Sequence, residues 1–214
     1  MTSLKQAWQT IVTASDYDLH MSNVGQAQAN AALTLELLQA SVIPPDSSLK
    51  FAGAGTGQMF DFADFSLLND FRVTFTDINA DFLDQLSNRA QAKGLRGFET
   101  LVEDVEIATP ADTVVLVLVL EHVDWQKALR AMAGAQRFLT ITQENPPEFS
   151  SAVTPGRVLP ESLVRAMEGE KPTLLAEHEL TEEMGNLGFT LSYQKRVDVP
   201  DGKVMRGAVW TRGA

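Results

Sequence analysis

The sequence has 214 residues, of which 44% are hydrophobic and 21% charged, a composition typical of a folded globular chain rather than a disordered one. Its formal net charge of −11 argues against binding to nucleic-acid phosphates or anionic membrane surfaces and favours a small-molecule substrate. The chain contains no cysteine, which excludes disulfides, thiolate zinc sites and cysteine nucleophiles. The N-terminus lacks the apolar core of a secretory signal, and no apolar run is long enough to cross a membrane, so we expect a cytoplasmic protein.

The first forty residues have a helical character. We expect helices at Thr2–Ala14 and Val24–Ala40, of which the second is rich in strong helix formers. Pro44 and Pro45 end this region. We therefore interpret the chain as a single domain in which residues 1–43 form a helical cap and residues 44–214 form the core.

The next part of the chain alternates strand candidates with helix candidates. The expected strands are Leu49–Ala52, Arg72–Thr76, Phe98–Val102, Thr113–Leu120 and Arg137–Thr142, and the expected helices are Gln58–Leu68, Ile78–Lys93 and Trp125–Ala133. The run Thr113–Leu120 is continuously apolar after its first residue, which is typical of a central parallel strand buried on both faces. This alternation predicts an α/β fold with a doubly wound, mostly parallel sheet.

The C-terminal part follows a different pattern. Residues 144–160 contain four prolines and predict a loop, and short helices are expected at Glu161–Glu168 and Leu180–Leu187. Two further strand candidates, Thr190–Val197 and Val204–Trp210, flank a Pro-Asp-Gly turn at residues 200–202. We expect them to form an antiparallel hairpin at one edge, which makes a sheet of seven strands.

Three glycines alternate directly after the first expected strand, at Gly53, Gly55 and Gly57. Glycines at this spacing let the backbone turn tightly and come close to a ligand. A helix expected directly afterwards would present its unpaired N–H groups to the same space. The loop, with Ala54 and Thr56 between the glycines, is therefore a candidate nucleotide site. A glycine-rich turn without a ligand is the alternative.

Two carboxylates follow the next two expected strands. Asp77 lies twenty residues after Gly57, where an acidic residue can accept hydrogen bonds from both ribose hydroxyls, or can instead cap the next helix. Asp104 can accept a hydrogen bond from an adenine amine while the N–H of Val105 meets a ring nitrogen; a solvated loop carboxylate is the alternative. Both positions lie at carboxyl ends of neighbouring strands, where ligands bind in such folds.

The order and spacing of these motifs carry a resemblance to a known family. Together with GAGTG, TDIN around Asp77, EDV around Asp104 and LEHV at Leu120–Val123, the sequence resembles the class I S-adenosylmethionine-dependent methyltransferases of the small-molecule type. Residues 111–125 resemble that family's fourth strand and the following loop, and residues 180–194 and 204–210 resemble its last helix and reversed last strand. YDLHM and QAQANAAL near the N-terminus resemble its helical cap.

The resemblance implies a cofactor and a reaction. S-adenosylmethionine would donate a methyl group to a small-molecule acceptor and leave as S-adenosylhomocysteine. The cofactor would contact the glycine loop, Asp77, Asp104 and Val105, and in addition Ile78 and Leu120.

One position departs from the family's pattern. The family carries an acidic residue two positions before the first glycine, where it helps to hold the methionine ammonium, and this chain has Phe51 there. An S-adenosyl-binding or partner-binding protein without turnover is therefore the alternative to an enzyme. An NAD-dependent oxidoreductase is a further rival, but it requires Gly-x-Gly-x-x-Gly, and the residue three positions after Gly55 is Gln58.

Four side chains are candidates for contact with the acceptor. His122, just after the fourth strand, is the best-placed candidate base, with a structural role as the alternative. Tyr17 and His20 precede the long N-terminal helix and are candidates for a lid, or for a simple capping turn. Glu144, after the fifth strand, is a candidate acceptor contact or a solvated side chain. The histidines lie far apart in the sequence, so we expect no metal site.

Overall fold

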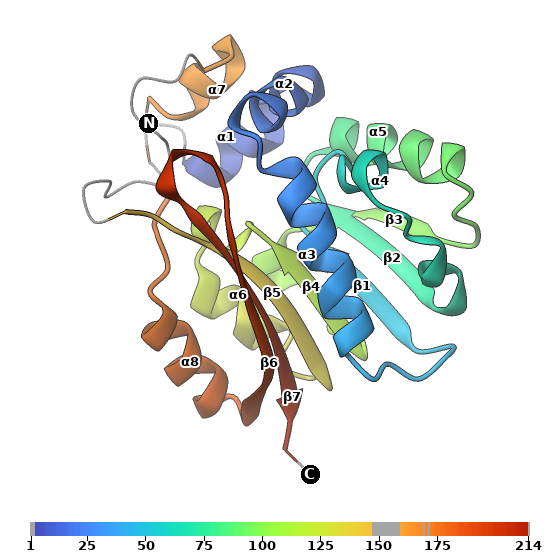
Figure 1. Ribbon diagram of the computed structural model, residues 1–214. Coiled ribbons are helices and arrows are strands. Elements are labelled where there is room, and N and C mark those ends of the chain that lie inside the picture. The colour runs from blue at the N-terminus through green and yellow to red at the C-terminus, as the bar shows by residue number, and fades with distance from the viewer. Residues whose placement is uncertain (1–2, 147–158, 169, 171, 214) are drawn as a thin grey trace.

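The computed structural model describes residues 3–146, 159–168, 170 and 172–213, and its centre is a twisted sheet of seven strands (Figure 1). The strands are β1 (Ser48–Ala52), β2 (Arg72–Asp77), β3 (Glu99–Val102), β4 (Thr113–Val117), β5 (Arg137–Glu144), β6 (Phe189–Asp198) and β7 (Val204–Arg212). Their order across the sheet is β3-β2-β1-β4-β5-β7-β6. Strands β1 to β5 pair in parallel, whereas β7 pairs antiparallel with both β5 and β6. The predicted mostly parallel sheet with a hairpin at one edge is confirmed.

Helices cover both faces of this sheet (Figure 1). The helices are α1 (Leu4–Thr10), α2 (Ala14–Val24), α3 (Ala27–Ala40), α4 (Met59–Phe62), α5 (Ala80–Ala92), α6 (Trp125–Ala131), α7 (Glu161–Ala166) and α8 (Glu177–Asn186). One face packs against α3 and α5 through a core that includes Leu37, Phe75 and Leu86. The other packs against α6 and α8 through a core that includes Leu129 and Met184. Because both faces are covered, β4 is buried on both sides, as its apolar run predicts.

A third apolar cluster lies beyond the carboxyl ends of the parallel strands. Helices α1, α2 and α7 gather there, at the top of Figure 1. Ala7 and Val12 from the N-terminal segment pack with Leu163 of α7 and with Phe82 of α5. This arrangement places a small helical layer over the edge of the sheet at which ligands bind in open α/β folds.

The N-terminal helices begin and end at different residues from those expected. The single helix expected at Thr2–Ala14 is wrong, because α1 ends at Thr10 and α2 begins at Ala14. The Thr13 side chain accepts a hydrogen bond from the N–H of Asp16 and so caps the new helix. Helix α3 begins at Ala27 rather than Val24, because Gly25 ends α2 in a left-handed conformation.

The helix expected after the glycine loop, at Gln58–Leu68, is also wrong. The chain forms only the single turn α4, and then a 3₁₀ helix at Ser66–Asp70. Between them, Asp64 Oδ1 accepts a hydrogen bond from the N–H of Ser66, a local bond that competes with continued helix. Phe60 and Phe65 are both buried and pack edge to face, which fixes the break.

Strand β4 ends earlier than the expected Thr113–Leu120. Its last residue is Val117, and Leu118 has a positive φ of 53°. This left-handed conformation is costly for a leucine and ends extended structure. The chain then turns into a 3₁₀ helix at Leu120–His122, so that Glu121 and His122 lie at the carboxyl end of the strand.

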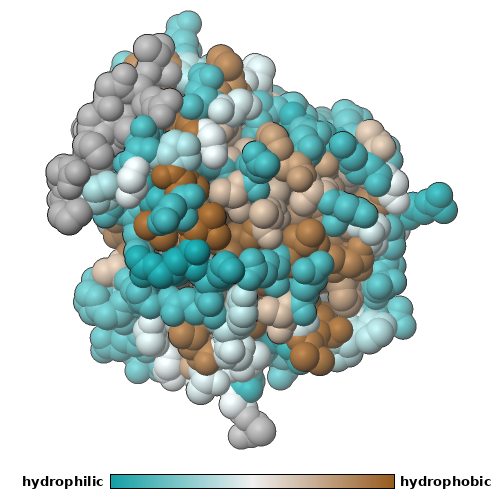
Figure 2. Space-filling model, viewed as in Figure 1, coloured by the Kyte–Doolittle hydropathy of each residue, from teal (hydrophilic) through white to brown (hydrophobic). Residues whose placement is uncertain are grey.

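The face of the molecule seen in Figure 2 is mostly polar. Figure 2 shows hydrophilic side chains over much of the viewed face, with hydrophobic residues gathered in patches across its middle. In the part of the chain that the structure describes, every helix is too short or too polar to span a bilayer. Most of the proline-rich loop expected at residues 144–160 lies outside the described residues.

The contact between α3 and the sheet gives a prediction about stability. A Cβ atom on Gly207 of β7 would lie 2.8 Å from Leu33 Cδ1 and 2.9 Å from Leu33 Cγ. Gly207→Ala should therefore lower the free energy of unfolding by about 1–3 kcal/mol, because overpacking forces a buried side chain to move. Urea denaturation measures this change.

The matched control is Gly185→Ala in α8, where an added Cβ meets no atom within 4 Å. This substitution should raise stability by about 0.5–1 kcal/mol, because alanine is the better helix former. Equal effects of the two substitutions would contradict the close packing of α3 on β7.

Candidate functional site

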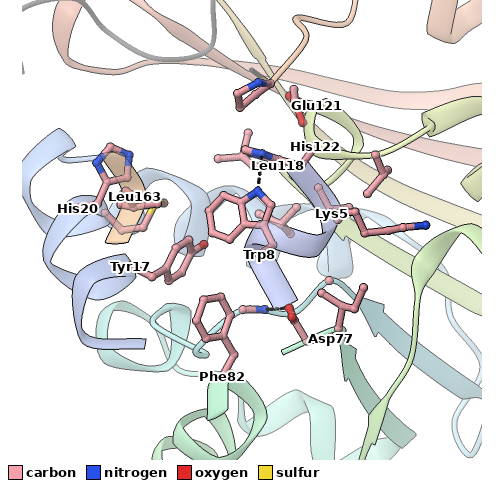
Figure 3. Close-up of a pocket in the computed structure, with 18 of the residues that line it drawn as sticks. Lys5, Trp8, Tyr17, His20, Asp77, Phe82, Leu118, Glu121, His122 and Leu163 are labelled. Atoms are coloured by element: carbon pink, nitrogen blue, oxygen red, sulfur yellow. Dashed lines mark hydrogen bonds between the residues drawn. The ribbon is translucent and has the colours of Figure 1, made fainter. Parts of the chain in front are cut away.

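A pocket opens at the carboxyl ends of the parallel strands, beneath α1, α2 and α7 (Figure 3). Nine of the residues expected at a site line it: Tyr17, His20, Gly53, Gly55, Asp77, Ile78, Asp104, Val105 and His122. They come from five separate parts of the chain, which the topology brings to one edge of the sheet. The convergence is what a ligand site at the strand ends requires.

The other expected site residues lie elsewhere. Ala54, Thr56 and Gly57 line a smaller neighbouring pocket, which also includes Phe51 and Asn30. Leu120 is 1% exposed and belongs to the core under α6. Glu144 does not line either pocket, because its carboxylate forms ion pairs with Arg196 and Arg206.

The glycine loop approaches its neighbours too closely for a side chain. Gly53 has a φ of 68°, and a Cβ atom there would lie 2.4 Å from Val119 Cγ2. Both the left-handed conformation and the contact distance require glycine. The loop is also tied to α2, because the Thr56 hydroxyl donates to the carboxylate of Asp18. The backbone between β1 and α4 is therefore fixed in a shape that leaves its inner edge open to the pocket.

Asp77 joins the glycine loop to the start of α5. Its Oδ2 accepts a hydrogen bond of 2.9 Å from the N–H of Gly55, and its Oδ1 accepts one of 2.9 Å from the N–H of Asn79. Burial raises the pKa of Asp77, although these hydrogen bonds act to lower it. The side chain that caps α5 is that of Asn79, which accepts from Asp81. Asp77 thus holds the loop and faces the pocket.

Asp104 ties the N-terminal helix to the same edge. Its Oδ1 accepts from the N–H of Glu106, and its Oδ2 pairs with Lys5 Nζ at 2.9 Å. Lys5 also pairs with Glu106 at 2.9 Å, and these carboxylates raise the pKa of Lys5. A carboxylate oxygen can accept two hydrogen bonds, and each oxygen of Asp104 accepts one here. Asp104 can therefore still accept a hydrogen bond from a ligand.

Aromatic side chains form the wall of the pocket between the loop and the helical layer (Figure 3). The ring of Trp8 lies edge-on to the rings of Tyr17 and Phe82, with distances between ring centroids of 5.9 and 6.4 Å. The Tyr17 hydroxyl faces Gly55, and burial together with the charge of Asp77 raises the pKa of this tyrosine. Trp8 and Phe82 were not predicted as site residues, because they belong to no motif and isolated aromatic residues more often lie in the core.

His122 contacts the same wall. Its Nδ1 accepts a hydrogen bond of 3.2 Å from Trp8 Nε1, so that the neutral ring is assigned its proton on Nε2. Burial lowers the pKa of His122 to about 4, and the imidazole is therefore uncharged near pH 7. A role as base would require the bond to Trp8 to break, and it stays a prediction.

Glu121 is the functional candidate that the sequence analysis missed. It lines the pocket and is only 4% exposed. Its Oε1 accepts a hydrogen bond of 2.8 Å from the N–H of Gln143, whereas Oε2 has no partner among the described residues. Burial raises the pKa of Glu121 to about 7. Its place next to His122 in LEHV was a signal, but the turn at Leu118 that directs the segment toward the pocket cannot be read from the sequence.

Comparisons with known proteins agree with this geometry. Residues 52–140 match a family model described as a methyltransferase domain. No curated protein matches the sequence significantly. This stretch is similar to a methyltransferase domain, and the fold is one that solved S-adenosylmethionine-dependent methyltransferases also have.

Solved structures share the fold at low sequence identity. Magnesium protoporphyrin IX methyltransferase from Synechocystis PCC 6803, with bound S-adenosylhomocysteine, is 18% identical over 89% of this chain and 84% of that chain, with a TM-score of 0.64. Mycolic acid cyclopropane synthase, complexed with S-adenosylhomocysteine, is 14% identical over 85% and 83%, with a TM-score of 0.58. The cyclase SpnF is 11% identical over 86% and 81%, with a TM-score of 0.64.

The buried carboxylate gives a prediction about pH. Glu121 has a folded pKa of about 7 against an ordinary value of 4.5. The ionised carboxylate therefore destabilises the fold. The free energy of unfolding falls as the pH rises from the ordinary pKa of 4.5 through the folded pKa of about 7. Glu121→Gln should raise the free energy of unfolding by about 3 kcal/mol at pH 8 and change it little at pH 4.5, as urea denaturation at both values would measure.

The control is Glu183→Gln, since Glu183 is also buried but pairs with Arg130 at 2.8 Å and does not line the pocket. This variant should be no more stable than the unmodified chain at pH 8. A gain from Glu121→Gln that does not depend on pH would show that the Glu121 carboxyl does not titrate near neutrality.

Proposed function

We propose that this chain transfers a methyl group from S-adenosylmethionine to a small-molecule acceptor held in the same pocket. The observation that carries the proposal is the convergence of Gly53, Asp77 and Asp104 on one pocket of a methyltransferase fold. Two of the structural relatives are described with S-adenosylhomocysteine bound, which supports the choice of cofactor.

The residues present fit an adenosyl group. The glycine loop has no side chains that would fill the space beside Asp77, and a side chain at Gly53 would collide with Val119. Asp77 has oxygen lone pairs left to accept from the two ribose hydroxyls, after its bonds to the backbone. Ile78 and Val105 offer apolar contacts to the adenine ring, and the N–H of Val105 lies next to Asp104, where it can meet a ring nitrogen.

The cofactor supplies a methyl group on a sulfonium, which is already a good leaving group. The protein then has to hold the acceptor in line and exclude water. Trp8, Tyr17 and Phe82 form an aromatic wall that suits this chemistry. Aromatic faces attract a cation such as the sulfonium, and the bulk of the rings keeps water out. Helices α1 and α7 close the pocket from the outside.

An acceptor of small size agrees with the shape and charge of the protein. The pocket lies under the helical layer of α1, α2 and α7 rather than on an open face (Figure 3). The net charge of −11 opposes the approach of a nucleic acid.

A binding protein without turnover is the second candidate, and Phe51 favours it. Phe51 is 2% exposed, and its ring packs against that of Phe75 with a distance between ring centroids of 5.1 Å. An apolar ring thus occupies the position where the family has a carboxylate. The nearby Asn30 Oδ1 is buried in the smaller pocket and has no hydrogen-bond partner among the described residues. Asn30 therefore offers an uncharged acceptor where the family's acid is missing.

Calorimetric titration with S-adenosylhomocysteine tests the cofactor site. We expect one equivalent to bind, and Asp77→Ala to weaken binding at least about tenfold, because two hydrogen bonds to a charged group are lost. Asp81→Ala is the matched control, since Asp81 is exposed in the first turn of α5.

Binding of NAD without S-adenosylhomocysteine would contradict the proposal. Tight binding of S-adenosylhomocysteine, with no methyl transfer from S-adenosylmethionine to any component of a metabolite extract, would instead favour the binding protein. Equal affinities of Asp77→Ala and Asp81→Ala would remove Asp77 from the site.

A further inference from the structure

The pocket has a second polar end, away from the glycine loop. Figure 3 shows Glu121 on the opposite side of the pocket from Asp77, with His122 and the aromatic wall between them. Glu121 is buried, and its Oε2 points into surroundings in which no described residue bonds to it. A buried carboxylate oxygen without a partner is costly, so its presence in a ligand pocket needs an explanation.

The groups around Glu121 leave that oxygen open. A short chain of amides positions the carboxylate, because Gln26 Nε2 donates to Gln143 Oε1 at 3.2 Å and the Gln143 N–H donates to Glu121 Oε1. The positive charge of Arg206 lowers the pKa of Glu121, but less than burial raises it. Arg206 itself pairs with Glu177 at 3.1 Å and with Glu144 at 3.6 Å, so its charge is offset by other carboxylates.

Three other titratable side chains line this part of the pocket: His20, His122 and Lys203. His20 of α2 lines it, and burial and the charge of Lys203 both lower the pKa of His20. His122 is held by Trp8 and is uncharged near neutral pH. The lining also includes the apolar side chains of Val123, Leu163 and Met167, and the buried polar side chains of Lys203 and Gln26. The subsite thus combines apolar side chains and one lysine with a carboxylate oxygen, Glu121 Oε2, to which no described residue bonds.

We propose that Glu121 is a specificity residue that binds the methyl acceptor by accepting a hydrogen bond from its O–H or N–H group. The acceptor is then an apolar small molecule that carries a hydroxyl or amine, and molecules that present a carboxylate to this end are rejected. This inference rests on the proposed function, because it takes the ligand of the subsite to be the methyl acceptor.

The selectivity follows from the chemistry of the carboxylate. An ionised carboxylate has only acceptor capacity, so it pairs with a donor and repels an anion. A site built around a buried polar group also rejects an analogue that lacks the matching group, because the buried oxygen is then left unpaired. An amide in place of the carboxylate would accept and donate, and so would reverse the preference.

Three probes that share one apolar body test this inference by calorimetry at pH 8: 4-ethylphenol, which donates; 4-ethylanisole, which does not; and 4-ethylbenzoate, an anion. We expect 4-ethylphenol to bind tightest. In Glu121→Gln its affinity should fall at least about tenfold and that of 4-ethylbenzoate should rise, because a hydrogen bond to a charged group is lost and an amide donor is gained. Glu183→Gln is the control and should keep the original order.

The titrations are run with and without S-adenosylhomocysteine, whose own affinity should not change in Glu121→Gln. Failure of S-adenosylhomocysteine to bind would count against the proposed function, while the probe order would still report on Glu121. The inference is overturned if Glu121→Gln keeps the order of the unmodified chain, or if the unmodified chain binds none of the probes.

A measurement on the unmodified chain keeps the test independent of any variant. When the pH falls from 8 to 6, Glu121 gains a proton, and the preference for 4-ethylphenol over 4-ethylbenzoate should narrow. A preference that stays constant over this range would also overturn the inference.

Discussion

The carboxylate of Asp77 holds together the parts of the molecule on which the pocket depends. It bonds to the backbone of the glycine loop on one side and to that of Asn79 on the other. Asn79 in turn donates from Nδ2 to the carbonyls of Trp8 and Val12, at 2.9 and 3.0 Å. One buried charge therefore connects the end of β2, the loop after β1, the start of α5 and the N-terminal cap. Backbone N–H groups offset part of the cost of burying it.

The opposite side of the pocket depends on a different constraint, the left-handed turn at Leu118. Such a conformation persists in a leucine only where the surroundings determine it, and here the Leu118 N–H bonds to the carbonyl of Ile141 in β5. The turn ends β4 and brings Glu121 and His122 to the pocket. The strained residue thus lies where two titratable side chains meet the ligand space, a common location for stored backbone strain.

The sheet was predictable because its signals are local. A β-branched and leucine run marks β4, and the Pro-Asp-Gly turn marks the β6–β7 hairpin. That Gly53, Asp77 and Asp104 line one pocket could be predicted from their spacing, since parallel strands bring their carboxyl ends together. The break after α4 could not be foreseen, because it depends on the Asp64 turn and on aromatic burial. Glu121 was missed for a similar reason: its burial results from tertiary packing, and an acidic residue in a loop is usually solvated.

A crystal structure of the protein with S-adenosylhomocysteine tests the central claim most directly. The account predicts that the nucleoside lies along Gly53 and Gly55, with its ribose hydroxyls on Asp77 and its base beside Val105. It also predicts that the space between the sulfur and Glu121 stays open for an acceptor. A ligand bound elsewhere on the protein, or one whose ribose makes no contact with Asp77, would contradict it.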